Sequence, residues 1–352
     1  MKFPKKGALI ACGILLLLGC IFLLSAALLP RPLTHERQAE RWAGESGKRF
    51  LQLTCVLSPG RTLEEDAIYS FRDNAMKKIE ESDFELSEGG TAFCDAWSTQ
   101  GTLKVSGPRG SFDAAALAVG GRFFDFHPLT LCSGSYLTES DLMRDRVVLD
   151  EQLAWMLYGG TDVAGLTVQI GEREFLIAGV VARQSDRFTR ASGELSPTLY
   201  LHYDCRELLG ESGVTSYELV LPEPVTGFAK GVAEDAFAKE GVVVQNTDRF
   251  SFSGSLQRLA GLTKLGVRTT AAVFPAWENA AVIAETACAL LRGAGLLCLA
   301  FPAIVLCAAA LQLLRRGARA LKQGAGQAKE SLLDRRDARR ERRIARRGGQ
   351  AS

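Results

Sequence analysis

Histidines and closely spaced cysteines, from which many metal and catalytic sites are built, are scarce in this 352-residue sequence. It has three histidines, no C-x-x-C, no paired histidine spacing, and neither an H-E-x-x-H nor a G-x-S-x-G motif. Structural zinc sites and common hydrolase nucleophiles depend on such patterns. These absences argue against zinc and against an enzyme, so we expect no catalytic residue, metal or cofactor.

Two short motifs resemble functional sites, and neither predicts chemistry. Residues 202–205 (HYDC) place a histidine next to a thiol. In a strand, however, His202 and Asp204 would share one face while Cys205 pointed to the other. Residues 44–48 (GESGK) resemble a phosphate loop but lack the G-x-x-x-x-G-K-[ST] spacing.

Net charge is also small, at +2, but the charges are strongly segregated. Residues 1–6 carry three lysines, and residues 315–352 have a net charge of +9. Residues 7–314 therefore carry −10. Basic ends around an acidic middle indicate that the ends and the middle face different environments.

Two apolar runs lie beside the basic ends. Residues 7–29 contain no charge, and residues 293–314 are bounded by Arg292 and Arg315. A helix rises 1.5 Å per residue, so each run can cross a hydrocarbon core about 30 Å thick. Pro302 falls inside the second run and is tolerated in such spans.

The second helical pattern begins before its apolar run, at about Glu278. Glu285 and Arg292 are seven residues apart and share one side of a helix. We therefore expect residues 278–292 to form a stalk that is continuous with the span. Phe274 and Trp277 then lie above the headgroups and are expected to pack on the outer domain.

The basic flanks predict the orientation, because lysine and arginine favour the cytoplasmic side. Two spans with both ends inside place the middle of the chain outside the cell membrane. The expected order is a cytoplasmic N-terminus (1–6), transmembrane helix 1 (7–29), an extracytoplasmic domain (30–277), a stalk with transmembrane helix 2 (278–314) and a basic cytoplasmic tail (315–352).

Two alternatives remain for the first apolar run. Residues 25–27 (SAA) could be the cleavage site of a signal peptide, although signal-peptide cores are usually about 7–15 residues long. Residues 17–20 (LLGC) resemble a lipobox with Cys20 as the lipidated residue, but the sequence stays apolar after that cysteine. The uncleaved span is favoured.

The basic tail predicts contact with anionic lipids, worth about 1 kcal/mol per basic residue near the surface. A membrane-tethered tail already accounts for the charge, so nucleic acid is not expected. Small residues in the second span could allow close packing and assembly with other helices, or could simply reflect the composition of spans. They are Gly293, Gly295, Ala300, Ala303 and Ala308.

Four of the nine cysteines fall in the predicted outer domain. An even number outside the cell permits two disulfides with three possible connectivities, and sequence does not choose among them. The candidates are Cys55, Cys94, Cys132 and Cys205. The other five lie in or beside the spans, where a cysteine acts as a small apolar residue.

The outer domain has the alternation of an α+β fold, which we expect to form two lobes. Residues 165–181 predict a β-hairpin, with apolar residues at alternate positions on both sides of Gly171. Residues 62–65 resemble a capping box, and residues 246–277 are expected to be a connector. Further strands are expected at 50–57, 91–97, 102–105, 147–149, 198–202, 217–221 and 242–245, an apolar run at 114–119, and helices at 62–81, 151–158 and 225–239.

Five motifs in order resemble the extracytoplasmic core domain of MacB-type ABC transporter permeases. They are GRFF (121–124), VVLD (147–150), a helix ending LYG (157–159), GLTVQI (165–170) and FLIAGVV (175–181), and PTLYL (197–201) matches a later region. The resemblance covers roughly residues 7–240. It implies an outer domain between two spans that extend as a stalk, which residues 36–50 and 278–292 suit. It also implies dimers and a cytoplasmic ATPase that moves the domain.

The sequence departs from that family in one respect. Family members normally have four spans, whereas this chain has two and no Walker motif. We therefore expect a non-catalytic subunit that works with a separate ABC ATPase, a longer permease, or both, as a homo- or heterodimer. The alternative is a stand-alone, membrane-anchored module that binds or scaffolds an extracellular partner.

Overall fold

The computed structural model describes residues 6–82, 84, 91–184, 186–192, 197–210, 213–261 and 274–348. The chain divides into two units. Residues 24–293 form the sheet domain, and residues 1–23 with 294–352 form the helical unit. Each is described separately below.

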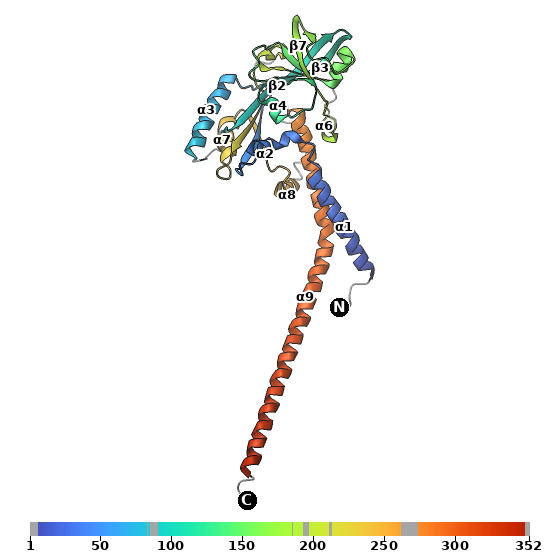
Figure 1. The fold of residues 1–352 in the computed structure, drawn as a ribbon, viewed down its shortest axis with the longest axis vertical. Coiled ribbons are helices and arrows are strands. Elements are labelled where there is room, and N and C mark those ends of the chain that lie inside the picture. Colours follow the sequence, from blue (N-terminus) through green and yellow to red (C-terminus); the bar gives the residue numbers. More distant parts are fainter. Residues whose placement is uncertain are drawn as a thin grey trace. The chain divides into compact units, whose positions relative to one another are not determined.

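The sheet domain is built on ten strands in one sheet (Figure 1). They are β1 (Phe50–Leu57), β2 (Cys94–Gly107), β3 (Gly110–Gly121), β4 (Leu131–Gly134), β5 (Arg146–Asp150), β6 (Thr167–Ile170), β7 (Arg173–Val181), β8 (Thr198–His202), β9 (Ser216–Pro222) and β10 (Gly241–Gln245). The order is β10-β1-β9-β2-β3-β8-β5-β7-β4, and β6 pairs with β2 and β7. Only the β3–β8 and β5–β7 pairs of this sheet are parallel.

Short helices connect and cover the strands. They are η1 (Thr34–Arg37), α2 (Gln38–Ala43), α3 (Glu65–Glu81), α4 (Phe123–Phe126), α5 (Glu151–Tyr158), α6 (Arg187–Ala191), η2 (Tyr203–Leu209), α7 (Phe228–Phe237) and α8 (Phe252–Ala260). Two long helices, α1 (Lys6–Leu28) and α9 (Ala276–Gly348), begin and end in the helical unit, respectively. The mixed helix and strand content confirms the expected α+β class.

The two faces of the sheet are covered differently. Apolar residues of α3 and α7 pack on one half of the first face, and those of α5 on the other half, in one continuous core. This division matches the two expected lobes, although a single sheet runs through both. The opposite face packs against α2, α4 and Trp277 at the start of α9 (Figure 1). The second face is therefore the one that meets the segments leading to the membrane helices.

The hairpin predicted from residues 165–181 is confirmed. Val168 pairs with Phe175 and Ile170 with Arg173, which leaves a two-residue turn at Gly171 and Glu172. Gly171 has φ of 59°, a conformation that suits glycine in such turns. Val168, Ile170 and Phe175 are each at most 2% exposed, as the alternation predicts.

Three local predictions need correction. The strands expected at 91–97 and 102–105 form one strand, β2, because β3 pairs along its length. The capping box is wrong: α3 starts after Glu64 without a side-chain cap, and Leu63 instead bridges to Val214. The segment 246–277, expected to be a connector, contains helix α8. Residues 262–273 of this segment lie outside the described part of the chain.

The first half of the predicted stalk, residues 36–50, is also wrong. Helix α1 ends at Leu28, and Pro30 and Pro32 follow in consecutive turns. Proline lacks the amide hydrogen that a continuing helix requires. The chain then enters the sheet domain, where Leu33 is 1% exposed and η1 and α2 pack near β1. Helix α9 runs unbroken from Ala276, so residues 278–292 are continuous with the second apolar run, as expected. That they form a stalk stays a prediction.

Two runs, Ile10–Leu28 and Ala276–Arg319, are long and apolar enough to span a membrane, and the helical unit contains a part of each. Only 11% of the most apolar stretch of each is buried, unlike the core helix of a soluble domain. The helices approach closely at two glycines: a Cβ on Gly295 would lie 3.1 Å from Leu23 and 3.3 Å from the Gly19 carbonyl oxygen. Small residues permit such packing, and Gly295 here serves a contact within the chain.

Gly179 gives a test of the sheet packing. A Cβ there would lie 2.4 Å from the carbonyl oxygen of Ser135, a backbone atom that cannot rotate away. We expect Gly179→Ala to lower the free energy of unfolding by about 1–3 kcal/mol through overpacking, measured by denaturant titration in mild detergent. The control is Gly160→Ala, where nothing lies within 4 Å. Equal losses in both variants would contradict this account.

Candidate functional site

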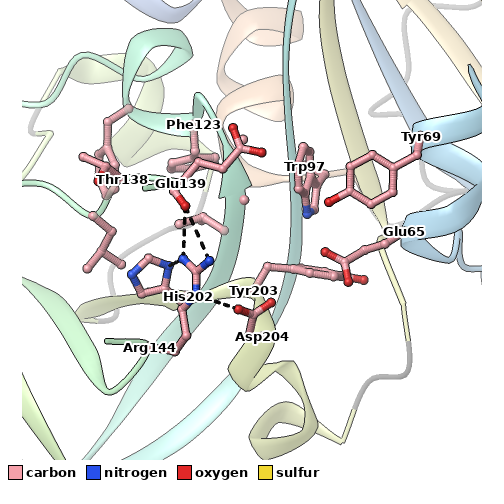
Figure 2. A pocket seen from close by; sticks show the side chains of 15 residues that line it. Glu65, Tyr69, Trp97, Phe123, Thr138, Glu139, Arg144, His202, Tyr203 and Asp204 are labelled. Atoms are coloured by element: carbon pink, nitrogen blue, oxygen red, sulfur yellow. Dashed lines mark hydrogen bonds and ion pairs between the residues drawn. The ribbon is translucent and has the colours of Figure 1, made fainter. Parts of the chain in front are cut away.

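The first three residues of the HYDC motif, His202, Tyr203 and Asp204, line a small cavity of about 90 Å³ (Figure 2). Pockets for drug-sized ligands are usually about 300–1,000 Å³. Two of the polar groups around it are paired: Arg144 Nε lies 2.8 Å from Asp204 Oδ2, and His202 Nε2 lies 3.2 Å from Asp141 Oδ2. The Tyr203 hydroxyl and Trp97 Nε1, which also belong to the lining, are buried without a hydrogen-bond partner among the described residues. Burial, followed by the charge of Arg144, lowers the pKa of His202. The cavity is therefore lined by the Arg144–Asp204 ion pair and by a histidine whose pKa is lowered.

The strand geometry assumed for residues 202–205 is wrong. Strand β8 ends at His202, and Tyr203 begins the 3-10 helix η2. Cys205 is buried, donates to the Arg144 carbonyl oxygen at 3.5 Å, and does not line the cavity. Burial raises the pKa of the Cys205 thiol, which keeps it protonated and poorly nucleophilic.

The structure gives no support to the predicted disulfides, since Cys55, Cys94, Cys132 and Cys205 are all free thiols. Cys55 and Cys94 lie on β1 and β2, with β9 between them. Two steps across a sheet place them about 10 Å apart, beyond the ~7 Å limit between bridged Cα atoms. They also face opposite cores. Burial raises the pKa of Cys94 to about 12.

A buried group of charges, here called the ionic junction, is the most distinctive polar feature of the sheet domain. It consists of Glu36, Arg249, Arg258, Glu278 and Glu285. Arg249 is central: its Nη1 lies 3.1 Å from both Glu36 Oε1 and Glu278 Oε2, and its Nη2 also donates to Glu278. Side-chain exposure is at most 3% for these three residues.

The junction extends outward along α9. Arg249 Nε lies 3.4 Å from Glu285 Oε2, and Arg258 Nε lies 4.0 Å from Glu285 Oε1. Asn246 donates to Glu36 at 3.1 Å and accepts from Thr54 of β1 at 2.9 Å. The network therefore reaches from α9 through the segment after β10 to the sheet.

The electrostatics of the junction follow from burial. Desolvation raises the pKa of Glu36, although Arg249 and Asn246 oppose this. Desolvation alone would lower the pKa of Arg249, but Glu278 and Glu36 outweigh it and raise that pKa. Three carboxylates surround two guanidinium groups, so the charge of Arg249 is required in this arrangement.

An aromatic cluster, which includes Phe123 and Phe124 of the GRFF motif, His127 and Trp277, lies beside the junction. The Phe123 and His127 rings stack with centroids 4.4 Å apart, and Trp277 of α9 meets His127 edge-on at 4.6 Å. His127 Nε2 lies 2.7 Å from Glu218 Oε2 on β9. Trp277 therefore packs on the sheet domain, as predicted, and Phe274 does so against Val56 and Val244.

His35 joins the aromatic cluster to the ionic junction. Its ring stacks on His127 at 6.0 Å, and its Nε2 lies 3.6 Å from Glu36 Oε1. Burial, followed by the proximity of His127, lowers the pKa of His35 to about 3. His35 is therefore neutral at physiological pH.

Both clusters connect the segments that lead to the membrane helices with the sheet. Glu36 lies eight residues after α1, and Trp277, Glu278 and Glu285 lie on α9. Sequence patterns had placed Glu285 and Arg292 on one side of a helix, and both indeed face the segment around Arg249. The patterns did not reveal Glu36, Arg249 or Glu278 as partners, because they come from distant segments.

No protein-family model and no curated protein matches the chain. The chain is similar to the periplasmic region of MacB from Actinobacillus actinomycetemcomitans, with 17% identity and a TM-score of 0.42, over 60% of this chain and 92% of that one. It is also similar to the extracellular domain of the noncanonical ABC-type transporter YknZ from Gram-positive bacteria, with 13% identity and a TM-score of 0.39, over 56% and 99%. Both belong to the type that the sequence resembles, but likeness at this level carries no functional argument.

The centre of the ionic junction can be tested by substitution. Arg249→Met removes the buried cation and leaves Glu36 and Glu278 without it, so we expect a loss of about 3–5 kcal/mol in unfolding free energy. The control is Arg49→Met, which breaks an exposed pair with Asp248 and should cost about 0–1 kcal/mol. Denaturant titration in mild detergent measures both, and similar losses would argue against a special role for Arg249.

The buried imidazole of His35 predicts that stability depends on pH. Below pH 6.5 the unfolded chain protonates His35, whereas the folded chain does not until about pH 3. Stability should therefore fall as pH drops through this window, by up to about 1.4 kcal/mol per pH unit for one proton. His35→Phe retains the ring and removes this dependence.

Unfolding free energies of the wild type and His35→Phe should be compared between pH 7 and pH 4. Glu36, whose raised pKa gives an opposing trend, is present in both chains, so its effect is expected to largely cancel in the difference. The difference should grow in favour of the variant as pH falls. Parallel profiles would show that His35 is not held neutral.

Proposed function

We propose that this chain is a non-catalytic membrane subunit of the MacB-like ABC permease type, part of an export or mechanotransmission complex driven by a separate ATPase. The observation that carries the proposal is the ionic junction. Arg249 joins Glu36, next to the segment from α1, to Glu278 on α9, and Asn246 links the same group to the sheet. The domain thus contains a mechanical connection between two membrane-linked segments.

Transmission through this connection requires no chemistry in the domain. A partner that binds one arrangement of the spans more tightly in one nucleotide state shifts the population towards that arrangement. Displacement of α9 moves Trp277 and Glu278 together, and these residues contact the aromatic cluster and Arg249. Because the packed interior is not continuously deformable, the sheet domain follows.

The proposed topology places both termini in the cytoplasm and the sheet domain outside, according to the charge flanks. The basic tail, which continues α9 to Gly348, then lies against the anionic cytoplasmic leaflet. In this arrangement the ATPase and any longer permease meet the chain in the membrane or at its cytoplasmic side.

The test is affinity purification of the tagged full chain from its native membranes in mild detergent, followed by identification of co-purifying proteins. We expect an ATP-binding subunit, with or without a four-span permease. A tagged two-span membrane protein from the same cells serves as the control. Recovery of the chain only with itself or with wall material would overturn the proposal and favour a tethered binding module.

A further inference from the structure

Helix α8 is fastened to α9 at the point where the second apolar run begins. Arg292 of α9 donates from Nη2 to the Phe250 carbonyl oxygen at 2.7 Å, and its Nη1 donates to Ser251 O and Ser255 Oγ. Ser251 also caps α8, accepting from Gly254 N at 3.0 Å. Both terminal nitrogens of Arg292 therefore donate to α8 and the turn before it.

The other end of α8 reaches the next residue of α9. A Cβ on Gly293 would lie 3.3 Å from Leu259 Cδ1, so the Leu259 side chain rests on this glycine. Gly293 is the first residue of the uncharged run 293–314. Helix α8 therefore packs against α9 at the residue where this uncharged run begins.

The exposed side of α8 is apolar where it should meet lipid. Phe252 and Leu256 are 50% and 42% exposed, and residues four apart share one face of a helix. Ser255, on the adjoining face, is buried against Arg292. Ser253 and Gln257 are exposed about 100° further round the helix, so a polar face borders the apolar one, as in an amphipathic helix.

We propose that α8 is an interfacial helix, with Phe252 and Leu256 inserted among the lipids of the leaflet that surrounds Gly293. Amphipathic helices of this kind lie in the membrane plane with their apolar side ~5–10 Å into the headgroup and acyl boundary. Continuity with the span argues for lipid as the occupant, because Arg292 and Gly293 hold α8 at the membrane surface. The guanidinium group of Arg258 contacts Glu285 and Thr286 of α9, away from the apolar side formed by Phe252 and Leu256.

The consequence is a second membrane contact for the domain, independent of the ATPase. It fixes the height at which α9 leaves the bilayer. It also resists tilting of the ionic junction, because Arg249 and Arg258, which pair with Glu285 of α9, lie in the segment that carries α8. The proposed insertion of α8 depends neither on the orientation of the chain in the membrane nor on the binding of a transport partner.

The test places a fluorophore on each side of α8 in the full chain, reconstituted in nanodiscs of mixed phosphatidylcholine and phosphatidylglycerol. Leu256→Cys and its neighbour Gln257→Cys are labelled with an environment-sensitive dye, in a background where the cysteines that are not buried are replaced by alanine. We expect blue-shifted emission and several-fold stronger quenching by shallow nitroxide lipids at position 256. Position 257 should respond to aqueous iodide instead.

A second pair, Phe252→Cys and Ser253→Cys, repeats the comparison one turn earlier and guards against a local effect of the dye. Iodide quenching that is equal at 256 and 257, or at 252 and 253, would overturn the proposal. Shielding of position 256 from both quenchers would also overturn it, because protein and not lipid would then cover that face.

Discussion

A single buried guanidinium is the constraint around which this domain is organised. Arg249 is surrounded by Glu36, Glu278 and Glu285 and is almost inaccessible to water. Removing such charges from water costs several kcal/mol per ion, which their attraction offsets only in a closely defined geometry. We regard the junction as a device that specifies one arrangement of α9, η1 and the sheet, and less as a source of net stability.

The ionic junction lies where it can fix the orientation of α9 on the sheet. Glu278 follows Trp277 directly, so one turn of α9 contacts both the buried charges and the aromatic cluster around Phe123 and His127. The aromatic cluster packs on the sheet face that is free of α3, α5 and α7. Each of the two contacts would by itself allow α9 to rotate about it, whereas together they fix the helix on the sheet.

Local patterns predicted the elements well, and long-range pairing poorly. The bounds of β1, α5 and β8 coincide with the predicted 50–57, 151–158 and 198–202, because alternation and helical spacing are properties of short segments. Glu36 and Arg249 are 213 positions apart, and no periodicity connects them. Helix α8 was missed because serine and glycine suggested a connector, although the Ser251 cap and the spacing of Phe252 and Leu256 were visible signals.

The correction to the stalk changes how force can enter the domain. Helix α9 is unbroken from Ala276, so a displacement of its span reaches Glu278 through helical hydrogen bonds. A displacement of α1 must pass the turns around Pro30 and Pro32 before it reaches Glu36. Turns have softer dihedral angles than a helix and transmit less of an axial movement. Under the proposed function, α9 therefore drives the domain, while the segment after α1 holds the opposite end of the Arg249 network in place.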